Sequence, residues 1–558
     1  MKSDHRPLPG GRLRAIRIPS LLRMLARDRR GNIVIPLAIC VALMVLIVGA
    51  GIDFARGYNA KVSLQAAVDA TALAANYDSN GLSDGKIRQN AVDYFNSIYT
   101  PPPGATPKLD VSVEKGTVTV NGTLDLPANF GGILGMSSME IGVQSQTVVG
   151  KATFDVAMVL DNSGSMRGSK LTTLKNAAKD LAETLLEVNQ VSDKKDRVKI
   201  GLVPFTSFVN VGSDKSGAAW MDQEGLSPIH WKNFEVRADG TPDPKEFDSR
   251  YMTNGRPSRF TLFKQLRGTD WRGCVEARPS PYDVTNTPPG TGNPATLFVP
   301  QFSPDEPDSQ NKKWYDDVYN SYLNDDKGAC TRDAKYVYSS KGMDRWEYAQ
   351  KRLCKYKNQP QNFGTTWQKG PNYNCRTEPL TELTENKSTV LQAIRNLRAD
   401  GNTNIHMGAV WGWRLLSKGA PFNSARTEED NEDGEHVRIL IVMTDGQNTY
   451  GSRYRWFMNT EPEAYGYGAE ERLGPGINSS WSIANTMDSR LATTCTNAKA
   501  DGVQVYTIAF QISDQNTVNM MRNCASKAAM AFDARSNSDL VDAFKRIADE
   551  ITRLRLNR

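Results

Sequence analysis

The chain has 558 residues, of which 39% are apolar and 23% charged, so it belongs with folded proteins and not with disordered or low-complexity ones. At about 150 residues per domain, this length predicts three to four structural units. Residues 1–30 contain nine Lys and Arg against two Asp, a charge of +7, and the remaining 59 basic and 60 acidic residues sum to −1. Because the positive charge sits in a tail and not on a folded surface, we expect no nucleic-acid partner.

An apolar segment follows this basic tail. Residues 33–52 are twenty residues without a charge, bounded by Arg30 before them and Asp53 after them. A helix of this length spans about 30 Å, the thickness of the hydrocarbon core of a bilayer. The basic residues before the segment predict a cytoplasmic N-terminus, with everything beyond Asp53 outside the cytoplasm. We therefore expect a single-pass protein of the inner membrane, and a cleaved signal peptide stays open as an alternative.

The cysteines fit an exported protein. Cys40 lies inside the apolar segment, and the other six cysteines follow it. An even number on the exported side is typical of disulfide-bonded proteins in an oxidising compartment. We expect Cys495 to pair with Cys524, because both lie near helical segments that flank one strand. Three pairings stay open for the remaining four: Cys274, Cys330, Cys354 and Cys375.

Two N-terminal regions precede the larger part of the chain. Residues 31–77 continue the apolar segment into an Ala-rich stretch that predicts one long helix. Residues 78–150 predict a small α+β module. Its alternating runs at 109–113 and 117–124 indicate a β-hairpin, and residues 140–149 indicate a further strand.

From Lys151 onward, apolar strands alternate with amphipathic helices. Buried strands are predicted at 156–160, 198–205, 439–443 and 503–510, and helices at 405–416, 482–500 and 538–554. This alternation is typical of an α/β fold with a doubly wound, mostly parallel sheet and helices on both faces. The pattern divides into a first part, residues 151–209, and a second part, residues 386–558.

Residues 210–385 interrupt this pattern as a large insertion. They contain 15 of the 28 Pro and 6 of the 10 Trp, together with four of the exported cysteines. We expect a disulfide-pinned lobe with little regular structure. Its aromatic residues have two interpretations: the core of a helix-poor lobe, or a recognition surface.

Three short motifs carry the oxygen ligands of a candidate metal site. Asp161-Asn162-Ser163-Gly164-Ser165 follows the first buried strand, residues 401–404 precede a predicted helix, and Thr444-Asp445-Gly446 ends another strand. The carboxyl ends of parallel strands are where ligands bind in open α/β sheets. Two carboxylates and three hydroxyls are hard ligands, which suit a divalent ion, Mg²⁺ first and Mn²⁺ or Ca²⁺ next.

The order of these motifs resembles the von Willebrand factor type A (vWA) domain with its metal-ion-dependent adhesion site (MIDAS). The resemblance covers about 151–209 and 386–555. It implies that hydroxyls approach the ion, that carboxylates bind it directly or through water, and that a partner protein supplies a further carboxylate. The metal ligands implied in this sequence are Asp161, Ser163, Ser165, Thr403 and Asp445.

The N-terminal region carries a second resemblance. Arg29-Arg30-Gly31-Asn32, the apolar segment and the Ala-rich run at 64–75 resemble the TadE/TadG-like segment of bacterial Flp (tight adherence) pilus assembly proteins. Together with the vWA-like part, the chain is similar to TadG-like proteins. This implies a membrane-anchored, extracytoplasmic binding or scaffolding component of a pilus assembly or secretion apparatus, which engages a protein partner of that machinery.

Two other functions stay open. One is a surface adhesin for host or matrix ligands. The other is a regulatory subunit of a chelatase-type ATPase, which the predicted topology disfavours because such an ATPase is cytosolic. The sequence contains no GxxxxGK[ST], GxSxG or HExxH motif, so we expect no enzyme and no catalytic residues.

Overall fold

The computed structural model describes residues 34–77, 83–114, 117–148, 152–191, 196–266, 268–312, 318–334, 343–358, 369–430, 436–453 and 455–556. The basic tail predicted over residues 1–30 lies outside these residues. The chain forms two compact units. The first contains the described residues up to 75 with 88–112 and 118–147, and the second contains 148–558 with the short segments 76–87 and 113–117.

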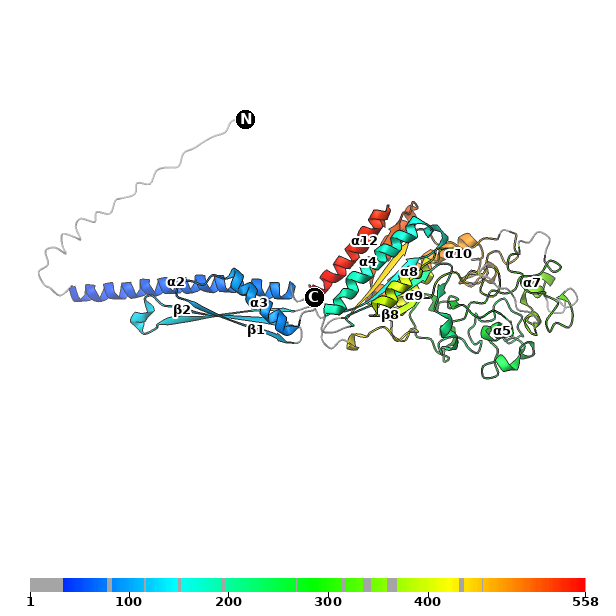
Figure 1. The fold of residues 1–558 in the computed structure, drawn as a ribbon, viewed down its shortest axis with the longest axis horizontal. Helices are drawn as coiled ribbons and strands as arrows, with labels where there is room; N and C mark the ends of the chain where they lie inside the picture. The colour runs from blue at the N-terminus through cyan, green and yellow to red at the C-terminus, as the bar shows by residue number, and fades with distance from the viewer. Residues whose placement is uncertain are drawn as a thin grey trace, which may run out of the picture. The chain divides into compact units, whose positions relative to one another are not determined.

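The first unit pairs helices with a three-stranded sheet in the order β1-β2-β3 (Figure 1). The predicted hairpin is present, and its two strands extend a few residues beyond the alternating runs that predicted them. The predicted third strand is also present and begins two residues earlier than expected. The elements are α2 (Val34–Tyr77), α3 (Asp84–Ile98), β1 (Thr106–Glu114), β2 (Thr117–Pro127), the 3₁₀ turn η1 (Gly131–Leu134) and β3 (Ser138–Val148).

Helix α2 has two different parts. Among the described helices, it is the one long and apolar enough to cross a membrane. Between Val34 and Val48, every side chain except the half-buried Leu46 is exposed, as a surface that faces lipid would be. Farther along, Leu64 and Val68 are fully buried. They lie against Gly122 of β2, where an added Cβ would come within 2.6 Å of Val68, so this glycine lets the helix approach the sheet.

The second unit is a mixed α/β structure with a mostly parallel sheet. The strand order is β11-β10-β9-β4-β5-β6-β7, with β8 paired to β5. The pairs from β11 to β5 are parallel, and β6, β7 and β8 join antiparallel. The strands are β4 (Thr153–Asp161), β5 (Val198–Phe205), β6 (Val209–Asn210), β7 (Cys274–Val275), β8 (Thr381–Thr384), β9 (His436–Thr444), β10 (Gln504–Phe510) and β11 (Ala531–Ala534).

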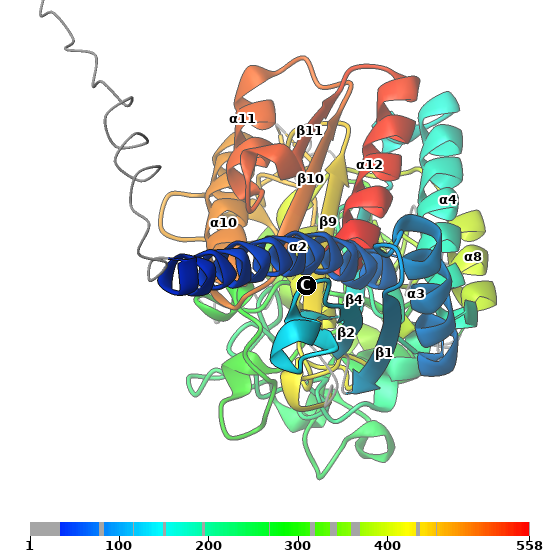
Figure 2. The same ribbon diagram turned by 90° about the vertical axis from the view of Figure 1, so that its left-hand side faces the viewer.

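Helices cover both faces of this sheet (Figures 1 and 2). Along β4, Val156 and Met158 belong to the hydrophobic core of one face, and Ala157 and Val159 belong to the core of the other. This alternation follows from the two-residue period of a strand, and it explains why a strand buried on both sides is apolar throughout. One face carries α4 (Ser169–Val191), α8 (Lys387–Asn396) and α12 (Asn537–Leu556), and the other carries α9 (Ile405–Leu415), α10 (Ser480–Ala500) and α11 (Gln515–Cys524).

The insertion contains little regular structure, with α5 (Arg259–Gln265) and α7 (Arg345–Lys351) as its α-helices among the described residues. Its aromatic side chains pack edge to face, as Phe263 and Phe302 do at a centroid distance of 4.9 Å. Trp231 and Trp271 are buried in the same core. Of the two interpretations of these aromatic residues, the buried rings favour the core of a helix-poor lobe.

Three disulfides join the exported cysteines. Cys495–Cys524 confirms the predicted pair. Among the three pairings left open for the other four cysteines, the structure contains Cys274–Cys375 and Cys330–Cys354. Cys40 is a free, exposed cysteine on α2.

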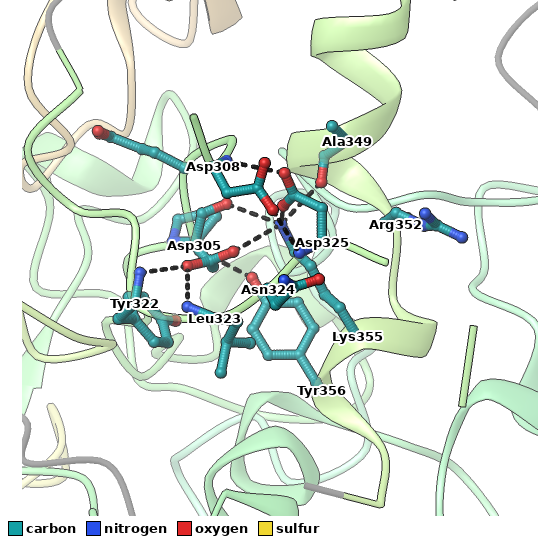
Figure 3. A network of polar contacts seen from close by, with 12 residues as sticks. Asp305, Asp308, Tyr322, Leu323, Asn324, Asp325, Ala349, Arg352, Lys355 and Tyr356 are labelled. Atoms are coloured by element: carbon teal, nitrogen blue, oxygen red, sulfur yellow. Dashed lines mark hydrogen bonds and ion pairs between the residues drawn. The ribbon is translucent and has the colours of Figure 1, made fainter. Parts of the chain in front are cut away.

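A fully buried lysine forms a polar centre inside the insertion (Figure 3). Lys355 Nζ lies 3.0 Å from Asp305 Oδ2 and 3.1 Å from Asp325 Oδ1, and all three side chains are inaccessible to solvent. The same ammonium donates to the backbone oxygens of Asp305 and Ala349. Burial acts to lower the pKa of Lys355, but the two carboxylates outweigh it and raise that pKa, so the side chain stays charged.

Candidate metal centre

Asp161 is the innermost residue of the candidate site. It ends strand β4, and its side chain is fully buried. Its Oδ1 accepts the backbone N–H of Ser163 at 2.7 Å, and its Oδ2 accepts the hydroxyl of Thr444, on the neighbouring strand β9, at 2.7 Å. The carboxylate is therefore held from two adjacent strands.

Two hydrogen bonds connect Ser163 and Ser165, which follow Asp161 in the chain, to the carboxylate of Asp445. Ser163 Oγ lies 2.9 Å from Ser165 Oγ, and Ser165 Oγ donates to Asp445 Oδ1 at 2.6 Å. Burial, and then the nearby charge of Asp445, raise the pKa of Asp161 to about 6, although the hydrogen bonds to Ser163 and Thr444 oppose this shift. The structure thus brings four of the five predicted ligands together: Asp161, Ser163, Ser165 and Asp445.

Thr403, the fifth predicted ligand, lies on the adjacent loop. Gly164 donates its N–H to Gly401 at 2.9 Å, which joins the two loops. The backbone of Thr403 exchanges two hydrogen bonds of 2.9 Å with Thr449, and the side chain of Asn404 caps helix α9. Within the described part of the chain, no hydrogen bond links the Thr403 hydroxyl to the four clustered side chains.

Lys170 is a member of the site that the sequence analysis missed. Its Nζ donates to Asp445 Oδ2 at 2.8 Å and lies 5.6 Å from the ring centroid of Phe510. The Asp445 side chain is fully buried in this pair, whereas the Lys170 side chain is 24% exposed. Lys170 is the second residue of α4 and belongs to no motif, so the sequence offered no signal for it.

The donor set fits a hard divalent cation. Among the described residues, no group of three or more His, Cys, Asp or Glu could hold a metal, so a site here depends on hydroxyls beside its two carboxylates. Thr206 lies beside the loop of Thr403: its buried Oγ1 has no hydrogen-bond partner among the described residues and would lie 3.5 Å from a Cβ placed on Gly401. Ser165 is exposed, which leaves the cluster accessible from solvent. Oxygen donors of this kind are those that Mg²⁺ and Ca²⁺ take.

Charged groups from other segments support the loop that carries Thr403. Asp400 Oδ1 lies 2.6 Å from Arg167 and 3.0 Å from Arg376 of the insertion. Asn402 donates to the buried carboxyl of Glu463. Burial raises the pKa of Glu463 to about 8, so this carboxyl is largely protonated at neutral pH.

Comparison with solved structures found similarity to pilus adhesins. SpaC from Lactobacillus rhamnosus GG is 11% identical over 81% of this chain and 35% of that protein, with a TM-score of 0.30. The vWF domain of the type V pili tip protein Mfa5 from Porphyromonas gingivalis is 10% identical over 72% of this chain and 95% of that one, with a TM-score of 0.30. The pilus adhesin RrgA from Streptococcus pneumoniae is 10% identical over 80% of this chain and 49% of that protein, with a TM-score of 0.31.

The chain spans about a third of the length of SpaC. A comparison with curated proteins found no match.

The N-terminal region matches a protein family. Residues 31–77 match the family model described as putative Flp pilus-assembly TadE/G-like. These residues include the whole of helix α2, so the apolar helix of this chain is a TadE/G-like segment.

Proposed function

We propose that this protein is a membrane-anchored, extracytoplasmic binding component of a Flp/Tad pilus assembly or secretion apparatus. In this proposal it is not an enzyme: it engages a protein partner of that machinery through a divalent ion, Mg²⁺ first. The residues that hold the ion are Asp161, Ser163, Ser165, Thr403 and Asp445.

The convergence of Asp161, Ser163, Ser165 and Asp445 carries the proposal. Hydrogen bonds of 2.6 to 2.9 Å hold these side chains together at the ends of two neighbouring strands. Hydroxyl ligands add no negative charge, so an ion held here keeps affinity for a further carboxylate. The exposed Ser165 marks the side from which a partner's Asp or Glu would reach it.

Three features support the extracytoplasmic placement. Helix α2 has the length and apolar composition of a membrane span. Its residues match a pilus-assembly family. The three disulfides lie beyond it in the chain, and stable disulfides are typical of compartments outside the cytoplasm.

Calorimetric titration of MgCl₂ into the full-length protein in detergent, after treatment with a chelator, tests the metal site. We expect saturable binding that Asp161→Ala abolishes, because the innermost carboxylate is lost. Asp239→Ala removes an exposed carboxylate of the insertion and serves as the matched control, which should bind as the unmodified chain does. Equal heats for Asp161→Ala and the unmodified protein would refute the metal site.

Cross-linking in living cells tests the partner. A photoreactive amino acid in place of Gln447, an exposed residue two positions after Asp445, should form cross-links to a protein of the pilus machinery. Combining it with Asp161→Ala should remove these cross-links, because capture requires the ion. Cross-links that persist in the Asp161→Ala background would show that the partner does not use the metal.

A further inference from the structure

The connection between β2 and β3 is an uncharged, apolar loop. Between Asp125 and Glu140, the segment LPANFGGILGMSSM contains no ionisable side chain. Ile133 is 66% exposed and Met136 is 56% exposed. Together with the exposed apolar side chains of the neighbouring part of α2, such as Ile47 and Val48, they enlarge one apolar surface, and a contiguous apolar surface marks a membrane or protein contact.

The loop is fixed to helix α2 by Asp53. The carboxylate of Asp53 is buried and accepts three backbone N–H bonds at 2.8 to 3.1 Å, from Asn129, Phe130 and Gly131. Arg56, one turn farther along α2, lies 3.5 Å from the same carboxylate. The buried carboxylate of Asp53, directly after the apolar segment, therefore has its hydrogen-bond donors in the backbone of the loop.

Phe130 extends this attachment into the apolar segment. A Cβ placed on Gly49 would come within 2.8 Å of the Phe130 side chain, so the ring lies directly on the helix at that residue. Leu46, Ala50 and Met136 line the same apolar hollow, which has a volume of about 200 Å³. The loop therefore contacts α2 at residues 46–53, which comprise the last two turns of the charge-free segment and the Asp53 that follows it.

We infer that the β2–β3 loop, residues 128–137, inserts into the lipid bilayer beside α2, with Ile133 and Met136 among the acyl chains. The inference rests on the proposed membrane anchor. At about 1.5 Å of rise per residue, Gly49 lies only some 5 Å inside the end of the apolar segment, so a loop packed on it is at the depth where acyl chains meet headgroups. The bilayer is the occupant that this depth dictates. The loop has no ionisable side chain that would have to enter the bilayer charged, and Asp53 already pairs three of its backbone N–H groups.

Lipid quenching of a fluorescent label tests this insertion. The full-length protein carries Cys40→Ala and Ile133→Cys, is labelled with an environment-sensitive NBD dye, and is reconstituted in phosphatidylcholine–phosphatidylglycerol vesicles. The other six cysteines are disulfide-bonded and do not react. We expect doxyl-labelled phosphatidylcholine to reduce the NBD emission at least twofold, and the same result for Met136→Cys.

Gln146→Cys is the matched control. Gln146 is an exposed residue of the same strand β3 whose first residue, Ser138, follows the loop. Gln146 lies eight positions beyond Ser138, which corresponds to about 26 Å along an extended strand. A label there should show no quenching by doxyl lipid.

A label on the native Cys40 separates this inference from the anchor on which it rests. Quenching at Cys40 without quenching at positions 133 and 136 would overturn the inserted loop and leave the anchor intact. No quenching at Cys40 would refute the anchor, and the inserted loop with it. A label at position 133 that doxyl lipid does not quench, and that an added protein shields from aqueous iodide, would instead identify the loop as a protein contact, which also overturns the inference.

Discussion

Lys170 provides the positive charge that balances the candidate metal centre in the described structure. Its ammonium lies 2.8 Å from Asp445 Oδ2, and this carboxylate also accepts the hydroxyl of Ser165. A divalent ion bound to Asp445 would meet the ammonium at close range. Because the lysine side chain is partly exposed, it can turn toward solvent without leaving a buried charge unpaired.

Removing this ammonium should strengthen metal binding. We expect Lys170→Gln to bind Mg²⁺ about fivefold more tightly, which corresponds to the loss of a competing ion pair of roughly 1 kcal/mol. Lys170→Arg keeps the charge and should bind as the unmodified chain does. Calorimetric titration measures both variants, and equal or weaker binding by Lys170→Gln would contradict the competition.

Glu463 should make the stability of the protein depend on pH. Its pKa is raised from 4.5 to about 8 in the folded chain, so folding favours the protonated carboxyl. This contribution is fully present below about pH 4.5 and is lost as the pH rises through about 8. We expect the thermal midpoint to fall across this window, and Glu463→Gln to reduce the fall because the amide cannot ionise.

Glu429→Gln is the control for this pH dependence. Glu429 is an exposed glutamate that precedes strand β9. Its replacement should leave the slope of midpoint against pH unchanged. If the slope is the same in Glu463→Gln as in the unmodified chain, folding does not raise the pKa of Glu463, and the prediction is contradicted.

At this scale, the sequence identifies only those site residues that lie in short motifs at strand ends. Asp161, Ser163, Ser165 and Asp445 follow apolar runs directly, so their convergence could be predicted from a parallel sheet. Lys170 meets Asp445 across 275 positions of the chain, through a helix face that shows no pattern for such a contact. That Thr403 coordinates the ion stays a prediction.

At the scale of elements, the long apolar runs were predictable and the short ones were not. Strands β4, β5, β9 and β10 lie in the middle of the sheet, where burial on both faces imposes uninterrupted apolar sequence. Strand β11 has four residues at the sheet edge, and α8 and α11 have ten residues each, too few to establish a helical period. Tertiary packing determines these elements, which is why the sequence alone did not reveal them.

The disulfide Cys495–Cys524 joins the predicted helix α10 to the short helix α11, beside β10. Closing 29 residues of chain should stabilise the fold by about 3–4 kcal/mol through the loss of unfolded-state entropy. We expect Cys495→Ser with Cys524→Ser to lower the free energy of unfolding by about this amount in urea. A change below about 1 kcal/mol would contradict this entropic contribution.

The buried lysine of the insertion should be more sensitive than a surface lysine. Lys355→Met leaves Asp305 and Asp325 buried without their cation, and breaking one partner of a buried ion pair costs about 3–5 kcal/mol. Lys351→Met, which removes a partly exposed partner of Glu347, should cost less than about 1 kcal/mol. Limited proteolysis followed by mass spectrometry measures both, and equal cleavage of the insertion in the two variants would contradict the role of Lys355.

At the scale of the whole molecule, charge, apolar composition and cysteine placement agree on one arrangement. The tail before the apolar segment carries a charge of +7, and the disulfides lie beyond that segment. Such an asymmetry is typical of a chain whose N-terminus stays in the cytoplasm. The candidate metal centre would then meet partners outside the cytoplasm, which is the central claim of the proposed function.

The most direct test of this claim is the location of the C-terminal end of the chain. Alkaline phosphatase, which is active only after export, is fused behind Arg558 in one strain, and a fluorescent protein that matures only in the cytosol is fused there in another. We expect phosphatase activity and no fluorescence. Fluorescence without phosphatase activity would place the metal centre in the cytoplasm and contradict the account.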